Sequence, residues 1–253
     1  MRIAVITGAS SGMGRQFAVQ AATENYDELW IVARREERLK ELARNLPVPV
    51  RIFALDLEER ESMKVIQKAL NEKCPRIDLL VNAAGFCKFG KTAEQSEAEV
   101  MGMISLNITA LTALTLVCLP YMMKGGRIIQ LSSVAAFQPL SGMNIYAASK
   151  AYVLHFSRAL HRELKQHGIT VTAVCPGWTK TEFFGVAKKT SNPGEVTKFP
   201  MMSRVEDVVR KALNDSKKGK ELSVYGFHNQ LQYVGTKLLP HRLIMTLWEK
   251  IKN

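Results

Sequence analysis

At 253 residues the chain is long enough for one large α/β domain with a real core, and its apolar and charged fractions are ordinary for a soluble globular protein. Its formal net charge of +12 fits a phosphorylated cofactor, an acidic carrier or a membrane surface, although solvated helix faces account for most of it, and no basic-aromatic motif indicates nucleic acid. We expect no signal peptide, no apolar run long enough to cross a bilayer, no metal site among the isolated histidines and scattered cysteines, and a reducing, cytoplasmic location.

Strand-like and helix-like runs alternate from one end of the chain to the other. The predicted strands are Arg2–Ile6, Leu29–Ala33, Val50–Leu55, Ile77–Val81, Gly126–Leu131, Ile169–Val174 and Glu221–Tyr225. The predicted helices are Gly12–Glu24, Glu36–Asn45, Glu59–Glu72, a helical stretch that runs to Met123 with a break near residues 102–105, and Tyr146–His167.

This alternation predicts an α/β fold with a doubly wound, mostly parallel seven-stranded sheet and helices on both faces. Several of the strands are almost wholly apolar, as expected when both faces of the sheet are covered. No linker, internal repeat or low-complexity segment interrupts the pattern, so we expect residues 1–253 to form a single domain.

The first turn, Thr7 to Gly14, follows a strand and opens a helix. Its glycines, Gly8, Gly12 and Gly14, permit tight turning and close backbone approach, and a helix N-terminus attracts phosphate. The spacing is G-x-x-x-G-x-G, which differs from the general G-x-G-x-x-G fingerprint of dinucleotide-binding turns. A purely structural turn is the alternative interpretation, which the strand–turn–helix context disfavours.

Tyr146 and Lys150 lie four residues apart, so on a helix they share one face. A free tyrosine has a pKa of about 10, and a nearby ammonium lowers that pKa by favouring the phenolate. Such a pair can pass a proton to or from a substrate oxygen near neutral pH. By itself Y-x-x-x-K is a weak signal, because most such pairs are simply solvated or half-buried.

Together these stretches resemble the short-chain dehydrogenase/reductase family, from Ile3 to about Phe184. This resemblance implies a Rossmann-type fold and oxidoreductase activity with a nicotinamide cofactor. The matching positions are Thr7, Gly8, Gly12 and Gly14 of the turn, Asn82-Ala83-Ala84-Gly85, Asn107, Ser133 thirteen residues before Tyr146, Tyr146 and Lys150, Pro176-Gly177, and Thr181.

The resemblance implies four catalytic residues. Ser133 would orient the substrate oxygen, and Tyr146 would donate the proton in reduction and accept it in oxidation. Lys150 would lower the tyrosine pKa and hold the nicotinamide ribose, while Asn107 would position a water that links Lys150 to solvent. Asn107 could instead only tie a helix kink together, and the neighbouring Ser132 is expected to be structural.

It also implies a cofactor-binding set. Within that set Asp56 could equally be a helix N-cap, Thr181 could cap a helix, and Asn82 and Gly85 are expected to shape a loop. The set comprises Gly8, Ser10, Ser11, Gly12, Met13, Gly14, Arg34, Arg35, Asp56, Leu57, Asn82, Ala83, Ala84, Gly85, Tyr146, Lys150, Pro176, Gly177, Thr179 and Thr181.

Arg34 and Arg35 come directly after the second predicted strand. Cofactors that lack the 2′-phosphate are usually recognised by an acidic residue at this place, whereas Arg can hold the phosphate by bidentate hydrogen bonds. The pair therefore predicts NADP(H), with Arg34 at the discriminating position. The alternative is that both residues only start a charged surface helix. Ser11 stands where many NADP-preferring relatives carry a second basic residue.

Substrate specificity is expected from three apolar regions. Residues 178–203 would form a substrate lid, and Phe86, Phe89 and residues 137–143 would complete the pocket. Their aromatic, aliphatic and sulfur-containing side chains favour an apolar or amphipathic carbonyl compound, although packing of the core or of a subunit interface is an equal alternative.

Residues 226–253 are expected to form a C-terminal helical extension that Pro240 breaks or kinks. Its apolar residues recur at roughly helical spacing, and Glu249 is the acid that opposes its basic residues. The segment could touch a membrane surface, cover the pocket or join subunits, with packing or oligomerisation favoured over membrane contact.

The leading prediction is an NADP(H)-dependent oxidoreductase that interconverts a carbonyl and an alcohol, reducing an apolar ketone or aldehyde such as a steroid-like, acyl or small carbonyl compound. One alternative is a 3-oxoacyl-[acyl-carrier-protein] reductase-like enzyme, and another is a non-catalytic NADP(H)-sensing protein. The resemblance also implies a homodimer or homotetramer, joined through the apolar faces of residues 105–123 and 147–164.

Overall fold

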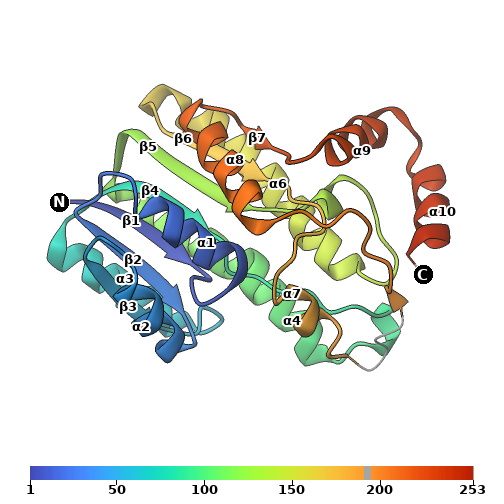
Figure 1. The fold of residues 1–253 in the computed structure, drawn as a ribbon, viewed down its shortest axis with the longest axis horizontal. Helices are drawn as coiled ribbons and strands as arrows, with labels where there is room; N and C mark the ends of the chain where they lie inside the picture. Colours follow the sequence, from blue (N-terminus) through green and yellow to red (C-terminus); the bar gives the residue numbers. More distant parts are fainter. Residues whose placement is uncertain (191–194, 253) are drawn as a thin grey trace.

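The computed structural model describes residues 1–190 and 195–252, and it contains one seven-stranded sheet in the order β3-β2-β1-β4-β5-β6-β7. Every neighbouring pair of strands is parallel, which confirms the predicted doubly wound fold (Figure 1). The strands are β1 (Arg2–Thr7), β2 (Glu28–Ala33), β3 (Val50–Ala54), β4 (Arg76–Asn82), β5 (Met122–Leu131), β6 (Thr170–Val174) and β7 (Leu222–Ser223).

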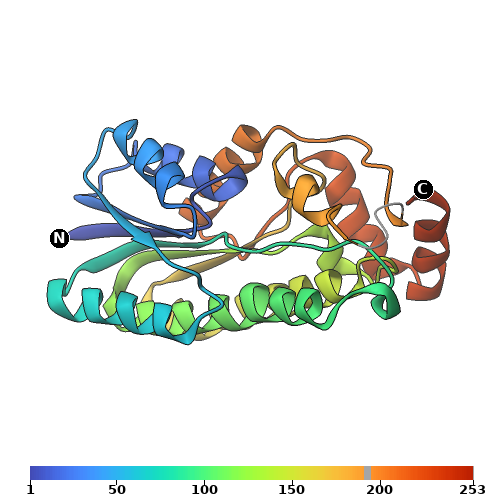
Figure 2. The ribbon, with the colours of Figure 1, turned by 90° about the horizontal axis from the view of Figure 1, so that it is seen from below.

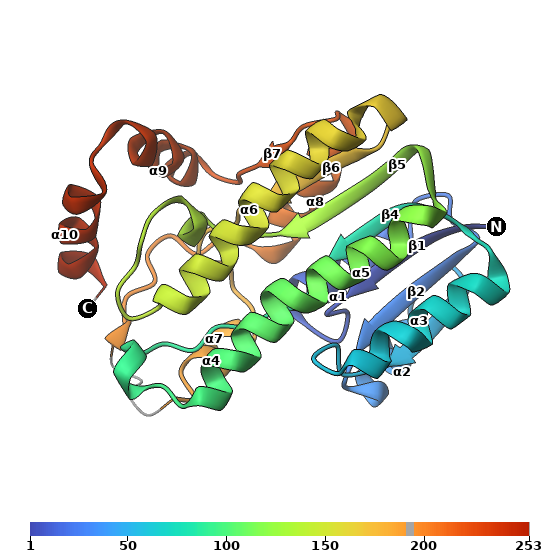
Figure 3. The ribbon, with the colours of Figure 1, turned by 180° about the vertical axis from the view of Figure 1, so that it is seen from behind.

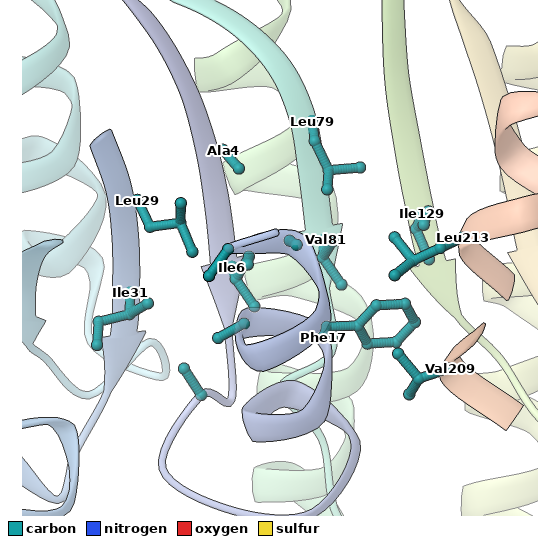
Figure 4. Close-up of a cluster of buried hydrophobic side chains, with 14 of the residues drawn as sticks. Ala4, Ile6, Phe17, Leu29, Ile31, Leu79, Val81, Ile129, Val209 and Leu213 are labelled. Carbon is teal, nitrogen blue, oxygen red and sulfur yellow. The ribbon is translucent and has the colours of Figure 1, made fainter. Parts of the chain in front are cut away.

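Two helix layers cover the sheet (Figure 2). The first contains α1 (Gly12–Ala21), α2 (Glu36–Arg44) and α8 (Val205–Lys217), and Figure 4 shows Phe17 of α1 and Val209 of α8 packed on the sheet residues Ile6 and Val81. The second contains α3 (Arg60–Lys73), α4 (Glu97–Ile104), α5 (Leu111–Cys118) and α6 (Asn144–Leu164) (Figure 3). Alternate strand residues enter opposite cores, which explains why the strands are apolar throughout.

Several predicted boundaries need correction. The first helix ends at Ala21 instead of Glu24, and the last strand is only Leu222–Ser223. No break occurs at residues 102–105, because the chain stays helical and passes through a π-helical segment, Ser105–Ala110. The helix also does not reach Met123, since Pro120 lies in a closing 3₁₀ turn and β5 begins at Met122.

The sequence patterns did not lead us to predict helix α8, Val205–Lys217. Its buried residues Val208, Val209, Ala212 and Leu213 follow the i, i+1, i+4, i+5 spacing of an amphipathic helix. The signal was therefore present in the sequence, between the irregular lid region and the last strand.

The continuous helical stretch Glu97–Tyr121 corrects one further expectation, because it is long and apolar enough by composition to cross a membrane. In the structure this stretch packs against α3, α6 and β4, with Leu111, Leu114 and Cys118 buried. It thus serves as a layer helix of the fold, and packing against the sheet accounts for its apolar character.

The C-terminal extension forms two helices, α9 (Phe227–Leu238) and α10 (His241–Ile251), at the end of the molecule away from the N-terminus (Figure 1). Pro240 is the N-cap of α10, so the predicted break is confirmed. Residue 253 and residues 191–194 of the predicted lid lie outside the described part of the chain.

Cys74 is the C-cap of α3 and lies at the amino edge of the sheet. It adopts a left-handed conformation, with φ of 41°, two residues before β4 begins. Its side chain is exposed, whereas Cys87, Cys118 and Cys175 are buried, and all four are free thiols.

Candidate active site

The glycine turn between β1 and α1 brings backbone atoms unusually close together. A Cβ on Gly14 would lie 2.3 Å from the carbonyl oxygen of Gly8, and a Cβ on Gly8 would lie 2.9 Å from the oxygen of Ala83. Gly8 and Gly12 have φ of 67° and 51°, a region that L side chains rarely adopt. The result is a backbone cradle at the N-terminus of α1, which fits the pyrophosphate of a dinucleotide cofactor.

Thr7 ties this turn to the loop after β4. Its Oγ1 accepts hydrogen bonds from the backbone N–H groups of Ala83 and Ala84, both at 3.0 Å. Gly85 completes the loop, because a Cβ there would lie 2.8 Å from Asn107 Oδ1 and 3.3 Å from Lys150 Nζ. The predicted Asn82–Gly85 segment therefore joins the glycine turn to the catalytic residues.

The arginines after β2 face two directions. Arg35 Nε donates to Ser10 Oγ of the glycine turn at 3.2 Å, and its Nη1 donates to Glu182 at 3.0 Å. Arg38, which the sequence analysis did not single out, donates to both carboxylate oxygens of Glu182 at 2.7 and 2.8 Å. The hydrogen bonds from Arg35 and Arg38 lower the pKa of Glu182. Arg35 and Arg38 thus form a basic site beside the turn, bridged by an acid of the lid region.

Arg34, the predicted discriminator, turns instead toward the end of β3. Its Nη1 lies 3.4 Å from Asp56 Oδ2 and 3.7 Å from Glu58 Oε1. Asp56 also accepts a hydrogen bond from the N–H of Glu58, but the N-cap of α3 is Glu59. The alternative role of Asp56 as the helix N-cap is therefore wrong, since it closes the turn that precedes the helix.

Ser133, Tyr146 and Lys150 meet at one buried point at the carboxyl end of β5. Lys150 Nζ lies 5.6 Å from the centroid of the Tyr146 ring and donates to the carbonyl oxygen of Leu131 at 2.8 Å. Ser133 Oγ accepts from the N–H of Ala135 at 3.1 Å and hydrogen-bonds Tyr146. The adjacent Ser132 Oγ donates to the carbonyl of Lys150 at 2.7 Å, which is a structural bond within the same turn.

Burial dominates the titration of both Tyr146 and Lys150. Desolvation raises the pKa of Tyr146, and the hydrogen bond with Ser133 opposes that rise. Desolvation lowers the pKa of Lys150 to about 8. The prediction that Lys150 lowers the tyrosine pKa therefore does not hold for the chain alone, because burial has the largest influence on that pKa and raises it. Tyr146 is protonated at neutral pH and can donate a proton.

Asn107 connects the loop after β4 to α6. Its Oδ1 accepts from the N–H of Phe86, while its Nδ2 donates to the Phe86 carbonyl and to Ser149 Oγ, each at 3.0 Å. The side chain is fully buried and comes from the π-helical segment Ser105–Ala110. Such π-turns often occur at functional sites, and here the turn places Asn107 Oδ1 beside Gly85, where Lys150 Nζ also lies.

Other predicted cofactor residues fall into two groups. Met13, Ala83, Gly85, Pro176, Gly177, Thr179 and Thr181 line the main cavity. Asn82 and Leu57 do not: Asn82 is buried and donates to Thr115 Oγ1 of α5, and Leu57 belongs to the core under the second helix layer. Thr181 Oγ1 accepts from the N–H of Phe183 at the start of α7 (Phe183–Ala187), but the N-cap of that helix is Glu182, so Thr181 lies one residue before the cap.

The main cavity has a volume of about 420 Å³ and contains Ser133, Tyr146 and Lys150 in its wall. The rest of the wall is mostly apolar or aromatic. It includes Val134, Leu140, Met143, Trp178, Phe183, Phe184, Pro200 and Met201. Within residues 1–190 and 195–252, no cluster of three or more His, Cys, Asp or Glu side chains offers a metal site.

Two predicted pocket residues lie elsewhere. Neither Phe86 nor Phe89 lines the cavity. Phe89 is fully buried and stacks on Phe199, with ring centroids 5.9 Å apart, and Phe86 is partly buried against the cluster that contains Phe89. Phe137 also lies off the cavity and packs against Tyr233 of α9. The core-packing alternative is therefore the correct one for these rings.

The sequence did not decide whether the C-terminal segment covers the pocket, and the structure shows that its two helices form part of the cavity wall. Asn229 of α9 lies so close to Gly177 that a Cβ on that glycine would be 2.4 Å from Asn229 Oδ1. Other wall residues from these helices are His228, Gln232, Ile244, Leu247, Trp248 and Ile251. Helical spacing had predicted helices here, but spacing alone does not tell which face meets the pocket.

A set of polar contacts fastens α10 over the pocket. Trp248 Nε1 donates to the carbonyl of Ser141 at 2.9 Å, and the Ser141 hydroxyl bonds Glu249. Lys252, only 6% exposed, donates to Glu195 at 2.6 Å, and its carbonyl accepts from the N–H of Thr197. The helix thus connects the loop before Tyr146 with the lid region.

Comparison with known proteins agrees with this geometry. A family model described as short chain dehydrogenase matches residues 2–192. Sulfoacetaldehyde reductase 2 of Chromohalobacter salexigens is 37% identical over 187 residues, 72% of this chain and 74% of that protein. The 3-oxoacyl-[acyl-carrier-protein] reductase FabG of Vibrio harveyi is 32% identical over 183 residues, 72% of this chain and 75% of the relative.

A solved short-chain dehydrogenase from Sphingobium yanoikuyae, in complex with NADPH, has a TM-score of 0.82 and 31% sequence identity. The match covers 96% of this chain and 95% of that one. The cradle of the glycine turn, the buried Ser133–Tyr146–Lys150 group and this similarity indicate a nicotinamide cofactor. The chain therefore belongs to the short-chain dehydrogenase/reductase family of oxidoreductases.

Proposed function

We propose that the protein is an NADP(H)-dependent oxidoreductase that interconverts a carbonyl and an alcohol and chiefly reduces an apolar ketone or aldehyde. The observation that carries the proposal is the position of Ser133, Tyr146 and Lys150 in one wall of a largely apolar cavity. Steroid-like, acyl and small carbonyl compounds are the substrate classes that such a wall accommodates.

The chain's own groups polarise the substrate oxygen and supply its proton. The Ser133 hydroxyl would hydrogen-bond the carbonyl oxygen, and the Tyr146 hydroxyl would transfer its proton to the developing alkoxide. The raised pKa of Tyr146 keeps that proton in place at neutral pH, which suits reduction. The bound cofactor supplies the hydride. Lys150, with a pKa of about 8, would hold the nicotinamide ribose and carry charge next to the tyrosine.

The preference for NADP(H) is proposed on three arginines that come after β2 in the sequence. Arg34 and Arg35 follow β2, and Arg38 joins Arg35 at Glu182. A guanidinium can bind a 2′-phosphate by charge-assisted hydrogen bonds, which an acid at the same place would repel. Ser10 positions Arg35 for this role through its hydroxyl.

Single substitutions separate these arginines. Arg34→Asp and Arg35→Asp are compared by the ratio of kcat/KM with NADPH to that with NADH. Loss of a hydrogen bond to a charged group should lower the ratio by about 10–100-fold at the residue that contacts the phosphate. A ratio unchanged in both variants contradicts the proposed discrimination, and a change in Arg35→Asp alone assigns the role to Arg35.

A 3-oxoacyl-[acyl-carrier-protein] reductase-like function is the second candidate. The net charge of +12 and the similarity to the Vibrio harveyi reductase favour it. The α9 and α10 helices that wall the pocket are a reason to prefer a free apolar carbonyl over a carrier-bound one. A non-catalytic NADP(H) sensor is disfavoured, because it has no need of Asn107, Ser133, Tyr146 and Lys150 together.

The deciding experiment follows NADPH absorbance with aliphatic ketones, steroid ketones and 3-oxoacyl thioesters, for the wild type and Tyr146→Phe. We expect turnover of at least one apolar class and a fall in kcat of about 10²–10⁴-fold in the variant, with NADPH affinity retained. Turnover only of acyl-carrier thioesters supports the second candidate. Tight NADPH binding without turnover across the panel supports the sensor.

We also propose a cytoplasmic homodimer or homotetramer that uses the outer faces of the second helix layer. Met101, Leu116 and Tyr152 are exposed there, by 51%, 59% and 39% respectively. Analytical ultracentrifugation of the wild type and a Leu116→Lys variant tests this interface. A variant that keeps the wild-type mass would contradict it.

A further inference from the structure

The α9 helix turns an apolar face away from the protein. Phe227, Leu231, Val234 and Leu238 are spaced i, i+4, i+7 and i+11, and they are exposed by 76%, 60%, 48% and 77%. This spacing places them along one side of the helix. None of the residues in α9 is buried, so the helix presents its apolar face to the surroundings instead of the core.

The neighbouring helix α10 also exposes apolar side chains. Leu239 in the connection is 43% exposed, and Leu243, Leu247 and Ile251, spaced i, i+4 and i+8, are exposed by 47%, 47% and 57%. We call these residues together with the four of α9 the C-terminal apolar face. Both helices project from one end of the molecule (Figures 1 and 3), so a flat partner can approach them. Apolar side chains exposed in such number on two neighbouring helices mark an interaction site.

The charges on these helices select the partner. Lys237, Arg242 and Lys250 are basic, Lys252 pairs with Glu195, and Glu249 is the acid of the segment from Phe227 to Lys252. A second copy docked symmetrically on this face would bring the same cations together, whereas a sheet of anionic headgroups would attract them. Apolar residues flanked by Lys and Arg are the pattern of helices that lie in a membrane interface.

The C-terminal apolar face also reaches the mouth of the catalytic cavity. Leu247 and Ile251 belong to both, and Met201, which is 67% exposed, lies on the cavity wall from the lid region. A lipophilic compound that leaves a bilayer at this face would meet apolar side chains along the way into the cavity. The position of the face therefore matches delivery of a substrate from lipid.

We propose that α9 and α10 dock the protein peripherally on an anionic lipid bilayer, with the C-terminal apolar face inserted at the interface and Lys237, Arg242 and Lys250 on the headgroups. This attachment is separate from catalysis. It depends on apolar burial together with charge, so it requires anionic lipid and weakens with salt.

The test is flotation of the full chain with extruded vesicles, made either of phosphatidylcholine alone or of an equal mixture of phosphatidylcholine and phosphatidylglycerol. We expect the protein to float with the mixed vesicles and to bind the neutral ones at least about tenfold more weakly. The double variant Leu231→Ser and Leu238→Ser should lose binding to the mixed vesicles by a similar factor.

Val65→Ser is the matched control, because Val65 is 46% exposed on α3, almost the same as the 48% of Val234, and lies outside the C-terminal apolar face. It should float like the wild type. NADPH binding, followed by cofactor fluorescence, shows that each variant is folded, since none of these residues lines the cavity.

Three results would overturn the proposal. The first is a wild type that stays unbound with mixed vesicles, and the second is a double variant that floats as well as the wild type. The third is a wild type that is larger than the double variant by analytical ultracentrifugation and does not float, which would show that a second copy covers this face.

Discussion

The glycine turn and the C-terminal helices border the same active site, but the chain holds them in different ways. At the turn, Gly8, Gly14 and Ala83 approach so closely that a single methyl group does not fit. In α9 and α10 no residue is buried, and they contact the rest of the protein through hydrogen bonds, the ring contact of Tyr233, the packing of Trp248 and the ion pair of the adjacent Lys252. The cofactor side is thus fixed by backbone sterics, whereas the substrate side is held by side chains that can change without altering the fold.

The largest expected effect comes from filling the glycine turn. In Gly14→Ala the new Cβ would lie 2.3 Å from the Gly8 carbonyl oxygen, so backbone must move. We expect a loss of about 3 kcal/mol in the free energy of unfolding, a Tm lower by roughly 6–12 °C, and weak cofactor binding. Calorimetry measures the free energy of unfolding and the Tm. Gly185→Ala, with no heavy atom within 4 Å of its Cβ, is the control, and equal losses in both variants would contradict the steric account.

The second effect concerns Lys150, which is 3% exposed with a pKa lowered to about 8 by burial. Because the unfolded chain binds this proton up to a pKa of about 10.4, the stability of the wild type should rise with pH between about 8 and 10.4. Below pH 8 the buried charge costs about 3 kcal/mol. Lys150→Met removes that cost and the hydrogen bond to Leu131, so it should gain about 2 kcal/mol at pH 7 and lose activity.

Urea unfolding at pH 7 and pH 10 measures this effect. The gain of Lys150→Met should nearly vanish at pH 10, because the wild-type lysine is then neutral in the folded protein. Lys68→Met, whose wild-type side chain is 79% exposed on α3, should show no such pH dependence. A gain that is the same at both pH values would rule out the buried charge as its cause.

The third effect tests whether α10 opens separately. Lys252→Met removes a buried partner of Glu195, and breaking a buried ion pair costs about 3–5 kcal/mol. Since no residue of α10 itself is buried, we expect the cost to appear as local opening, with faster hydrogen exchange in α10 and a higher KM for the substrate but a nearly unchanged global Tm. Lys250→Met, on the exposed side, is the control. A large fall in global Tm would mean that α10 is part of the cooperative core.

The smallest effect is expected at Gly235 in α9. A Cβ there has no heavy atom within 4 Å, and alanine favours a helix interior by about 1 kcal/mol over glycine. Gly235→Ala should therefore slow hydrogen exchange in α9 and leave the Tm of the core unchanged. Faster exchange in α9 would show that the helix needs a bend at this glycine.

These contrasts also explain what the sequence could predict. The strands and the glycine turn follow from short local patterns, apolar runs and glycine spacing, and both were placed close to their observed positions. The meeting of Ser133, Tyr146 and Lys150 needs long-range packing, and it was expected only through the family resemblance. Arg38 and Glu182 were missed because they are 144 residues apart and neither stands in a recognised motif.

The errors share a physical cause. Phe86 and Phe89 were expected in the pocket because aromatic residues near a site can line either a cavity or a core, and composition does not distinguish these. The direction of the Tyr146 pKa was wrong because proximity to Lys150 was visible in the sequence but the depth of burial was not. Both depend on which side of an element faces solvent, which tertiary packing decides.

Cys74 has a practical consequence for experiments on this protein. It is the exposed thiol of a chain whose three other cysteines are buried, and it lies at the amino edge of the sheet, whereas the active site lies at the carboxyl edge. A maleimide dye should therefore react at one position and leave turnover unchanged. The labelled enzyme would allow energy-transfer distances to a lipid-borne acceptor, which report the orientation of the protein on a vesicle.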